Sequence, residues 1–268
     1  MAERIEWNPR GVVDGAAMKQ ASPAGRFQPD PALAPFVEHH WTVAWDLRGQ
    51  VPVTRETLPH PSVHLVIEAD RSGLSGPTTA RFSRRLEGEG RALGVKFLPG
   101  GFRPFWRGPV SGLANRVLSL EEAFGSAGLD LETAVLRCGE DEDAAVAHAE
   151  AFFLERLPGP DAQARLARHV VARILENPGL MRAEAVAEDA GLNLRALQRL
   201  FSDYVGVSPK WVIQRYRLHE AMARLESGER LDLARLALDL GYFDQAHFNR
   251  DFKALLGRTP GGYASLGR

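Results

Sequence analysis

The sequence predicts an α+β protein. We expect a β-rich N-terminal domain of barrel or sandwich type, a helical linker, and an all-α C-terminal domain with two helix-turn-helix units joined by a long helix. Short aromatic and β-branched runs, broken by glycine and proline, fill residues 1–118. Helical patterning begins at Ser119. Between Ala187 and Pro260, one pattern of helix, glycine and helix occurs twice.

The composition is that of a globular protein that can bury a core, with 44% apolar and 25% charged residues in a chain of 268. No run of about eighteen apolar residues occurs, so we expect no transmembrane helix and no membrane partner. The first eleven residues, MAERIEWNPRG, lack the apolar segment of a secretory signal. Cys138 is the only cysteine, which excludes an intrachain disulfide and fits a reducing cytoplasm, where we expect the protein.

The first 118 residues are expected to form a β-rich sensor domain. Residues 1–35 are rich in proline, glycine and alanine and are expected to be an irregular lead-in. The strands after them show aromatic or β-branched alternation between turn residues. They are expected at 36–47, 62–68 and 92–98, with shorter extended pieces at 51–58 and 79–88.

Residues 119–158 are expected to be a helical linker. Ser119 and Glu122 have the spacing of a capping box, in which each side chain satisfies a free N–H group of the first turn. Further helices are expected at 130–137 and 141–157, and the second opens with acidic residues that suit the positive end of a helix dipole. The sequence Leu157-Pro-Gly-Pro160 then marks a domain boundary. The linker either forms a dimer surface or covers the β domain.

Four histidines of the N-terminal domain raise the question of a metal site. His39 and His40 are adjacent, and neighbouring residues of a strand point to opposite faces. His60 and His64 are separated by a proline, and their spacing matches no common ligand pattern. Structural histidines are therefore the favoured interpretation, and we expect no metal ion or other cofactor.

The mouth of the predicted barrel is the default place for a small-molecule effector. Aromatic side chains there can serve both the core and a ligand. The candidate effector-binding residues are Trp41, His60, His64 and Phe97. Dispersed histidines and single carboxylates offer no acid–base set, so we expect no catalytic residues.

The repeat has the layout of two helix-turn-helix units. Its alanine and glycine positions recur at a spacing of 50 and its later positions at 51, so the second turn holds one extra residue. Glycine leaves a helix in the left-handed conformation at low cost, which places the turns at Gly191 and Gly241. The matching positions are Ala187, Gly191, Leu197, Arg199, Phe201, Gly206 and Pro209 in the first copy and Ala237, Gly241, Phe248, Arg250, Phe252, Gly257 and Pro260 in the second.

Asn193 and Asp244 are suitable N-caps for the second helix of each unit. Arginine and amide side chains on these helices are those that recognise guanine and adenine edges in the major groove, while arginines also contact phosphates. The predicted DNA-binding residues are Arg195, Gln198 and Arg199 in the first unit and Gln245, Ala246, His247, Asn249 and Arg250 in the second.

A long helix at 209–226 separates the units. Its length of about 27 Å suits two successive major grooves, which lie about 34 Å apart on one face of a duplex. Residues 162–268 carry 16 basic and 12 acidic residues, whereas residues 1–161 carry 17 and 22. The positive balance favours contact with phosphates. Double-stranded DNA is therefore the predicted partner.

Residues 162–268 resemble the DNA-binding domain of the AraC/XylS family of bacterial transcription regulators. The resemblance is carried by the run from Gly241 to Phe252, by Gly257 to Tyr263, and by the matching residues of the first unit. It implies seven helices with two helix-turn-helix units, base contacts at the residues predicted above, and RNA polymerase as a further partner. Ala246 stands where the family often has a polar residue, which leaves contact with a thymine methyl.

The N-terminal half resembles poorly characterised sensor domains of such regulators, through Leu58 to Ile67 and Gly94 to Gly101. This resemblance implies a cupin-like β domain with no particular ligand. The favoured hypothesis is a sequence-specific transcription regulator that an effector modulates, with a homodimer as one expected assembly. The alternatives are an effector-independent DNA-binding protein and an enzyme on the β domain that the C-terminal half targets to DNA.

Overall fold

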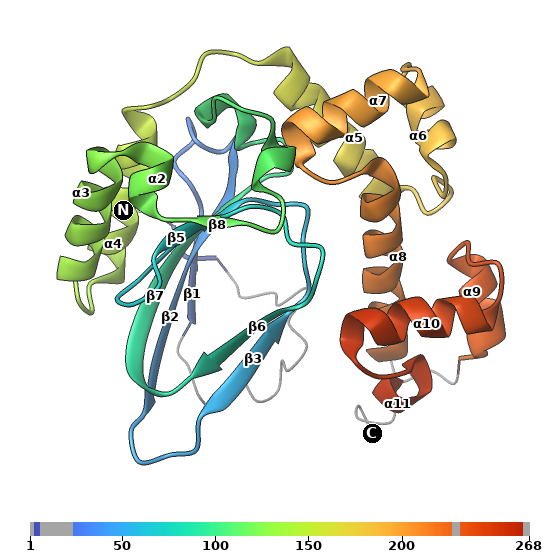
Figure 1. Ribbon diagram of the computed structural model, residues 1–268, viewed down its shortest axis with the longest axis horizontal. Coiled ribbons are helices and arrows are strands. Elements are labelled where there is room, and N and C mark those ends of the chain that lie inside the picture. The colour runs from blue at the N-terminus through green and yellow to red at the C-terminus, as the bar shows by residue number, and fades with distance from the viewer. Residues whose placement is uncertain (1–2, 6–23, 227–230, 265–268) are drawn as a thin grey trace.

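The computed structural model describes residues 3–5, 24–226 and 231–264. Its N-terminal half is built on a six-stranded sheet in which all neighbouring strands are antiparallel. A two-stranded ribbon lies on one side of this sheet (Figure 1). Residues of the sheet and of the ribbon line a common cavity. In spatial order, the sheet contains β1 (Ala24–Phe27), β2 (Val37–Leu47), β7 (Gly88–Phe97), β4 (His64–Glu68), β5 (Gly73–Ser75) and β8 (Val117–Leu118), and the ribbon contains β3 (Val53–Thr57) and β6 (Phe82–Leu86).

The predicted α+β class is confirmed, and the five expected extended segments correspond to β2, β4, β7, β3 and β6. The prediction of an irregular lead-in is wrong at Ala24–Phe27, because this segment pairs with β2 as an edge strand. Phe27 is fully buried there, which gives the short strand its anchor in the core. Residues 6–23 of the lead-in lie outside the described residues.

Two glycines of β7 allow tryptophans of β2 to lie across the sheet. In the strand register, Gly94 is opposite Trp41 and Gly90 is opposite Trp45. A Cβ atom added at Gly94 would lie 2.0 Å from the Trp41 indole, and one at Gly90 would lie 2.2 Å from that of Trp45. Any larger residue would displace these rings, so glycine is required at both places for a close approach.

Three helices cover the other face of the sheet. They are α2 (Leu120–Phe124), α3 (Ser126–Arg137) and α4 (Glu142–Leu154), and the predicted capping box of Ser119 and Glu122 begins the first. Val146 and Phe153 of α4 are fully buried in one cluster with Leu65 and Phe97 of the sheet. These helices cover the β domain (Figure 1). A dimer surface on residues 119–158 stays a prediction.

The described part of the C-terminal half contains seven α-helices around two hydrophobic cores. The long helix α8 contributes Val212 and Ile213 to the first core and Leu218 and Met222 to the second. In Figure 1, the first unit lies near one end of α8 and the second near the other. The helices are α5 (Ala162–Glu176), α6 (Ala183–Asp189), α7 (Leu194–Leu200), α8 (Pro209–Glu226), α9 (Leu233–Asp239), α10 (Gln245–Leu256) and α11 (Pro260–Ala264), with a π-helical turn η3 (Phe201–Val205) after α7.

The N-terminal half contacts both units. Two 3₁₀ turns, η1 (Arg103–Phe105) and η2 (Val110–Leu113), lie against η3 of the first unit. The hydroxyls of Ser111 and Ser202 are 3.0 Å apart across this contact. At the second unit, Arg81 donates a hydrogen bond to the carbonyl oxygen of Leu256. Throughout the described ranges, no helix combines the length and apolar character needed to cross a membrane.

Candidate nucleic-acid interface and ligand cavity

The two copies of the sequence repeat form turns with the same hydrogen bonds. Gly191 and Gly241 adopt the predicted left-handed conformation, with φ of 65° and 77°. The amide after each glycine donates to the carbonyl of the repeated alanine, over 2.8 Å from Leu192 to Ala187 and 2.9 Å from Tyr242 to Ala237. Both alanines are buried, which lets the two helices of each unit approach closely. The sequence repeat is therefore a structural repeat.

The predicted N-caps begin the second helix of each unit. The Asn193 side chain accepts a hydrogen bond from the amide of Ala196, and the Asp244 side chain accepts one from the amide of His247. These bonds satisfy backbone donors that have no partner within the helix. The inner faces of α7 and α10 are held by buried apolar residues, which are Leu197 and Leu200 in α7 and Phe248, Phe252, Leu255 and Leu256 in α10.

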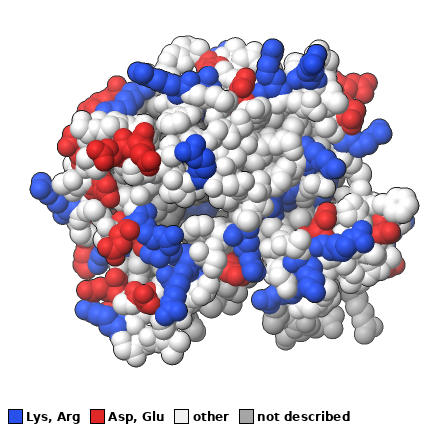
Figure 2. Space-filling model, in the orientation of Figure 1, with Lys and Arg blue, Asp and Glu red and all other residues white. Residues whose placement is uncertain are grey.

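In the first unit, all three predicted DNA-binding side chains point outward. Arg195, Gln198 and Arg199 are exposed on α7. By contrast, Arg215 and Arg217 of α8 are buried, and burial lowers the pKa of Arg215 to about 10. The number of basic residues in this half therefore does not by itself identify a DNA-binding face. Figure 2 shows acidic side chains gathered over α3 and α4, on the far side of the N-terminal half from these units.

In the second unit, the predicted residues differ in exposure. Ala246 and Arg250 are exposed, whereas Gln245, His247 and Asn249 are half-buried. His247 Nε2 lies 3.5 Å from Asp251 Oδ2, and the His247 ring packs edge-on against Tyr242. Asn249 Oδ1 is buried without a hydrogen-bond partner among the residues that the structure describes. Arg250 is therefore the one exposed polar side chain among the predicted DNA-binding residues of this unit.

Sequence reasoning missed Phe243, which is 87% exposed beside the N-cap Asp244. An aromatic residue inside a helix-turn-helix turn was the signal that could have identified it.

A cavity of about 310 Å³ lies between the six-stranded sheet and the ribbon of β3 and β6. This volume is at the lower end of the range of about 300–1,000 Å³ for small-molecule sites. Three of the four candidate effector-binding residues, Trp41, His60 and His64, line it. Phe97 does not, because it points to the opposite face of β7 and is fully buried against Phe102 and Phe153. We therefore leave Phe97 out of the candidate site.

The charged side chains that line this cavity are mostly basic. Arg26, Arg55, Arg84 and Lys96 line it, together with the single carboxylate of Glu68. Arg84 forms an ion pair with Glu68, and Lys96 Nζ lies 3.0 Å from Glu38 at the end of the cavity. Sequence reasoning missed these basic residues, although Lys96 stands between the apolar residues Val95 and Phe97 in its strand.

The histidines of the cavity are held in the neutral form. Burial, followed by the charge of Lys96, lowers the pKa of His64 to about 3 and that of His60 well below its ordinary value. His39, opposite Lys96 in the strand register, also has a lowered pKa because it is buried. Neutral histidines in a positive environment can donate or accept hydrogen bonds without adding charge.

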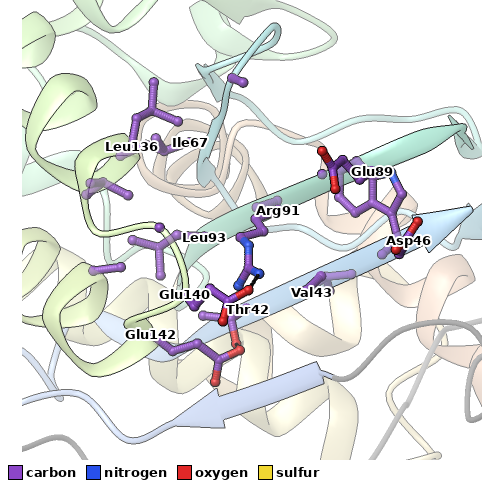
Figure 3. A pocket seen from close by; sticks show the side chains of 18 of the residues that line it. Thr42, Val43, Asp46, Ile67, Glu89, Arg91, Leu93, Leu136, Glu140 and Glu142 are labelled. Carbon is purple, nitrogen blue, oxygen red and sulfur yellow. Dashed lines mark hydrogen bonds and ion pairs between the residues drawn. The ribbon is translucent and has the colours of Figure 1, made fainter. Parts of the chain in front are cut away.

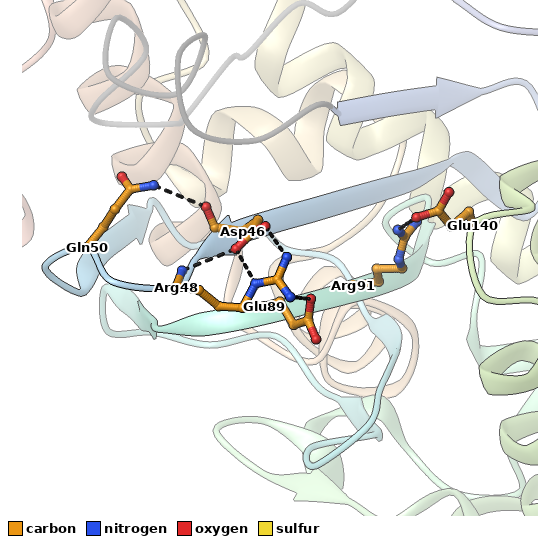
Figure 4. A network of polar contacts seen from close by, with 6 residues as sticks. All are labelled: Asp46, Arg48, Gln50, Glu89, Arg91 and Glu140. Carbon is orange, nitrogen blue, oxygen red and sulfur yellow. Dashed lines mark hydrogen bonds and ion pairs between the residues drawn. The ribbon is translucent and has the colours of Figure 1, made fainter.

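A second cavity, of about 520 Å³, opens on the other face of the sheet between β2, β7 and the helices α3 and α4 (Figure 3). Its charged groups are paired with one another. Arg48 contacts Asp46 and Glu89, and Arg91 contacts Glu140 (Figure 4). Most of these groups are exposed, so the pairs contribute little to stability. A further carboxylate of the lining, Glu142, pairs with Arg4. Four carboxylates and two arginines therefore line this groove, and its excess charge is negative.

In the described part of the chain, no group of three or more histidine, cysteine, aspartate or glutamate side chains is arranged to hold a metal ion. Neither cavity contains a group of that kind.

The two halves match two protein families. Residues 25–119 match a domain of unknown function (DUF6597), and residues 186–265 match a helix-turn-helix domain. Among curated proteins, the chain is similar to RclR, an RCS-specific HTH-type transcriptional activator of Escherichia coli (strain K12), with 33% identity over 95 residues. The match covers 35% of this chain and 33% of RclR, so the chain spans about a third of the length of that relative.

The chain is also similar to solved structures, at low identity and with TM-scores below 0.5. The C-terminal domain of AraT, a response regulator from Geobacillus stearothermophilus, is 24% identical, with 40% of this chain and 88% of that chain covered and a TM-score of 0.35. ToxT from Vibrio cholerae strain SCE256, solved with an unsaturated fatty acid bound, is 14% identical, with 91% and 95% covered and a TM-score of 0.37.

Proposed function

We propose that this chain, whose C-terminal half is a helix-turn-helix domain of the AraC/XylS type, is a DNA-binding transcription regulator. The observation that carries the proposal is the structural repeat itself. Two turns with the same hydrogen bonds each present a capped helix whose exposed side includes an arginine at the equivalent position, Arg199 or Arg250. Arginine at such a position can bind the O6 and N7 atoms of guanine or a backbone phosphate.

The spacing of the units fits one DNA duplex. The helix α8 contains 18 residues, which corresponds to about 27 Å of helix. A rigid helix of this length can hold α7 and α10 over successive major grooves, about 34 Å apart. One chain can then contact two grooves, although a homodimer and contact with RNA polymerase belong to the same proposal.

The test compares Arg199→Ala and Arg250→Ala with Arg137→Ala, a control on the exposed surface of α3. Binding sites selected from fragmented genomic DNA supply the duplex for fluorescence anisotropy. Each of the first two variants is expected to weaken binding by about 1–3 kcal/mol, or roughly 5- to 150-fold. Thermal unfolding checks that the fold is retained. Unchanged affinity in both variants would show that α7 and α10 do not contact DNA.

The N-terminal half is proposed to regulate DNA binding through a small molecule held between its sheet and ribbon. The support is the position of this cavity, whose lining residues include Leu58 of the second unit's core. An effector-independent regulator is the competing proposal. It predicts that no cavity ligand changes DNA affinity.

A further inference from the structure

We propose that the second helix-turn-helix unit recognises thymine in the major groove, by apolar contact between the Phe243 ring and the C5-methyl group of the base. The inference deepens the proposed function, on which it rests, because it names what the start of α10 would contact in DNA. It concerns the second unit alone, since the first unit has no residue that corresponds to Phe243.

Phe243 is the residue by which the second turn is longer than the first. Before it, the amides of Leu192 and Tyr242 make the same hydrogen bond to the repeated alanine. After it, Asn193 and Asp244 cap the next helix in the same way, each by accepting a hydrogen bond from the amide three residues later. Both ends of the insertion are therefore held by equivalent bonds, and Phe243 alone stands between them.

The Phe243 side chain lies outside the core of the unit. It is 87% exposed, whereas Tyr242 directly before it is 7% exposed and belongs to the core with Phe248 and Phe252. Single exposed apolar residues are common on protein surfaces. This one, however, lies directly before α10, and the first residues of the second helix are those that contact base edges in helix-turn-helix proteins.

The outward side chains of α10 are less polar than those of α7. Arg195 of α7 corresponds to Ala246, and both are exposed. Gln198, which is exposed, corresponds to Asn249, which is half-buried with its Oδ1 buried. The short side chain of Ala246, one turn after Phe243, leaves the aromatic ring open to the groove. The second unit therefore has an apolar surface where the first has an arginine.

The charge at this end of α10 disfavours a phosphate as the group in contact. Asp244 Oδ1 accepts a hydrogen bond of 2.7 Å from the His247 amide. Its carboxylate thus stands at the positive end of the helix, where a phosphate would otherwise be attracted. Phe243 and Ala246 have no side-chain donor to offer a phosphate. An apolar group of the DNA is the better match for this surface.

Thymine supplies such a group. Its C5-methyl is the apolar group that base pairs present in the major groove, and phenylalanine and alanine are among the residues that contact it. Ala246 and Arg250 are four residues apart and share one face of α10. The unit would therefore combine an arginine contact with a methyl contact at a nearby base pair, whereas the first unit offers arginine and glutamine side chains.

The test replaces thymines by deoxyuridine, which pairs as thymine does but lacks the methyl group. The duplex is the site selected from genomic DNA for the full chain, with one thymine replaced at a time, and binding is measured by fluorescence anisotropy. At the thymine that faces Phe243, the replacement is expected to weaken binding by the parent chain about fourfold, the equivalent of one buried methyl group. In Phe243→Ala, the same replacement should have an effect of less than about twofold, because the contact is already lost.

Val51→Ala is the matched control, because Val51 is an apolar residue of the N-terminal half with 83% exposure. It should bind every duplex as the parent chain does. Phe243→Ala removes no charge, so it should also keep the parent's dependence of affinity on salt concentration. A weaker salt dependence would show that the substitution moves α10 away from phosphates, and would overturn a direct contact with the methyl group.

Two further outcomes would overturn the inference. One is that no deoxyuridine weakens binding by the parent chain, and the other is that every deoxyuridine effect persists in Phe243→Ala. Failure of the proposed function has a different signature, because Arg199→Ala and Arg250→Ala would then both bind DNA as the parent chain does. If the arginine variants weaken binding and Phe243→Ala does not, DNA binding by α7 and α10 stands and the thymine contact is wrong.

Discussion

The two helix-turn-helix units share one turn geometry but differ in what completes them. The core of the first unit is formed by residues of α5 to α8. The core of the second includes Leu58, which comes from the N-terminal half. The first presents Arg195, Gln198 and Arg199 outward, whereas the second exposes mainly Ala246 and Arg250. Under the proposed function, this difference predicts that a change in the N-terminal half alters the DNA contact of the second unit more than that of the first.

The largest expected difference between the two units follows from truncation of the Leu58 side chain. This side chain is 1% exposed, and Leu→Ala in a core costs about 2–5 kcal/mol. Leu58→Ala should therefore loosen the second unit, raising hydrogen exchange in α10 more than in α7. Leu65→Ala, at a fully buried position of the N-terminal core, is the matched control. If both variants raise hydrogen exchange in α10 equally, Leu58 stabilises the second unit no more than a residue of the N-terminal core does.

A second expected difference concerns how the stability of the chain depends on pH at His219, which lies on α8 beside the second unit. Burial, followed by the charges of Arg215 and Lys96, lowers the pKa of His219 to about 3. An unfolded histidine titrates near pH 6.5, at about the ordinary value. Between about pH 6.5 and 3, the unfolded chain therefore binds a proton that the folded chain excludes. Stability should fall with falling pH by up to about 1.4 kcal/mol per pH unit for this histidine.

His219→Asn tests this effect, because asparagine does not titrate. Urea unfolding at a series of pH values gives the free energy of unfolding as a function of pH. The slope of this dependence should be shallower in His219→Asn than in the parent chain, by the equivalent of about one proton. The pKa of His64 is also lowered by burial, so His64→Asn should make the pH dependence of stability shallower by a similar amount. Lys96, Glu38 and His39 remain in both variants, so their contributions cancel in the comparison. An unchanged slope in His219→Asn would show that this group already titrates normally in the folded chain.

The sequence predicted several features of the two units. The features that it failed to predict were missed for physical reasons. The sequence repeat was sufficient to predict the positions of both turns, because a turn of this kind needs a left-handed glycine and an N-cap within a few residues. The edge strand β1 was missed because pairing with β2, a distant segment, stabilises it. The basic wall of the cavity was missed because only the register of β3 with β6 places Arg55 opposite Arg84. Leu58 lies about 160 residues before the core that it completes, and no local pattern marks such a contact.

The smallest expected difference concerns the turn glycines themselves. An alanine at either position must adopt a left-handed conformation, which costs about 1–2 kcal/mol. At Gly191, a Cβ atom meets nothing within 4 Å, so Gly191→Ala should show this cost alone. At Gly241, the Cβ atom would lie 2.5 Å from Met181 Sδ, so Gly241→Ala must also displace a flexible side chain. In thermal unfolding, Gly241→Ala should therefore have a lower Tm than Gly191→Ala. Equal losses would mean that Met181 moves aside freely, and that the second turn is no more constrained by its surroundings than the first.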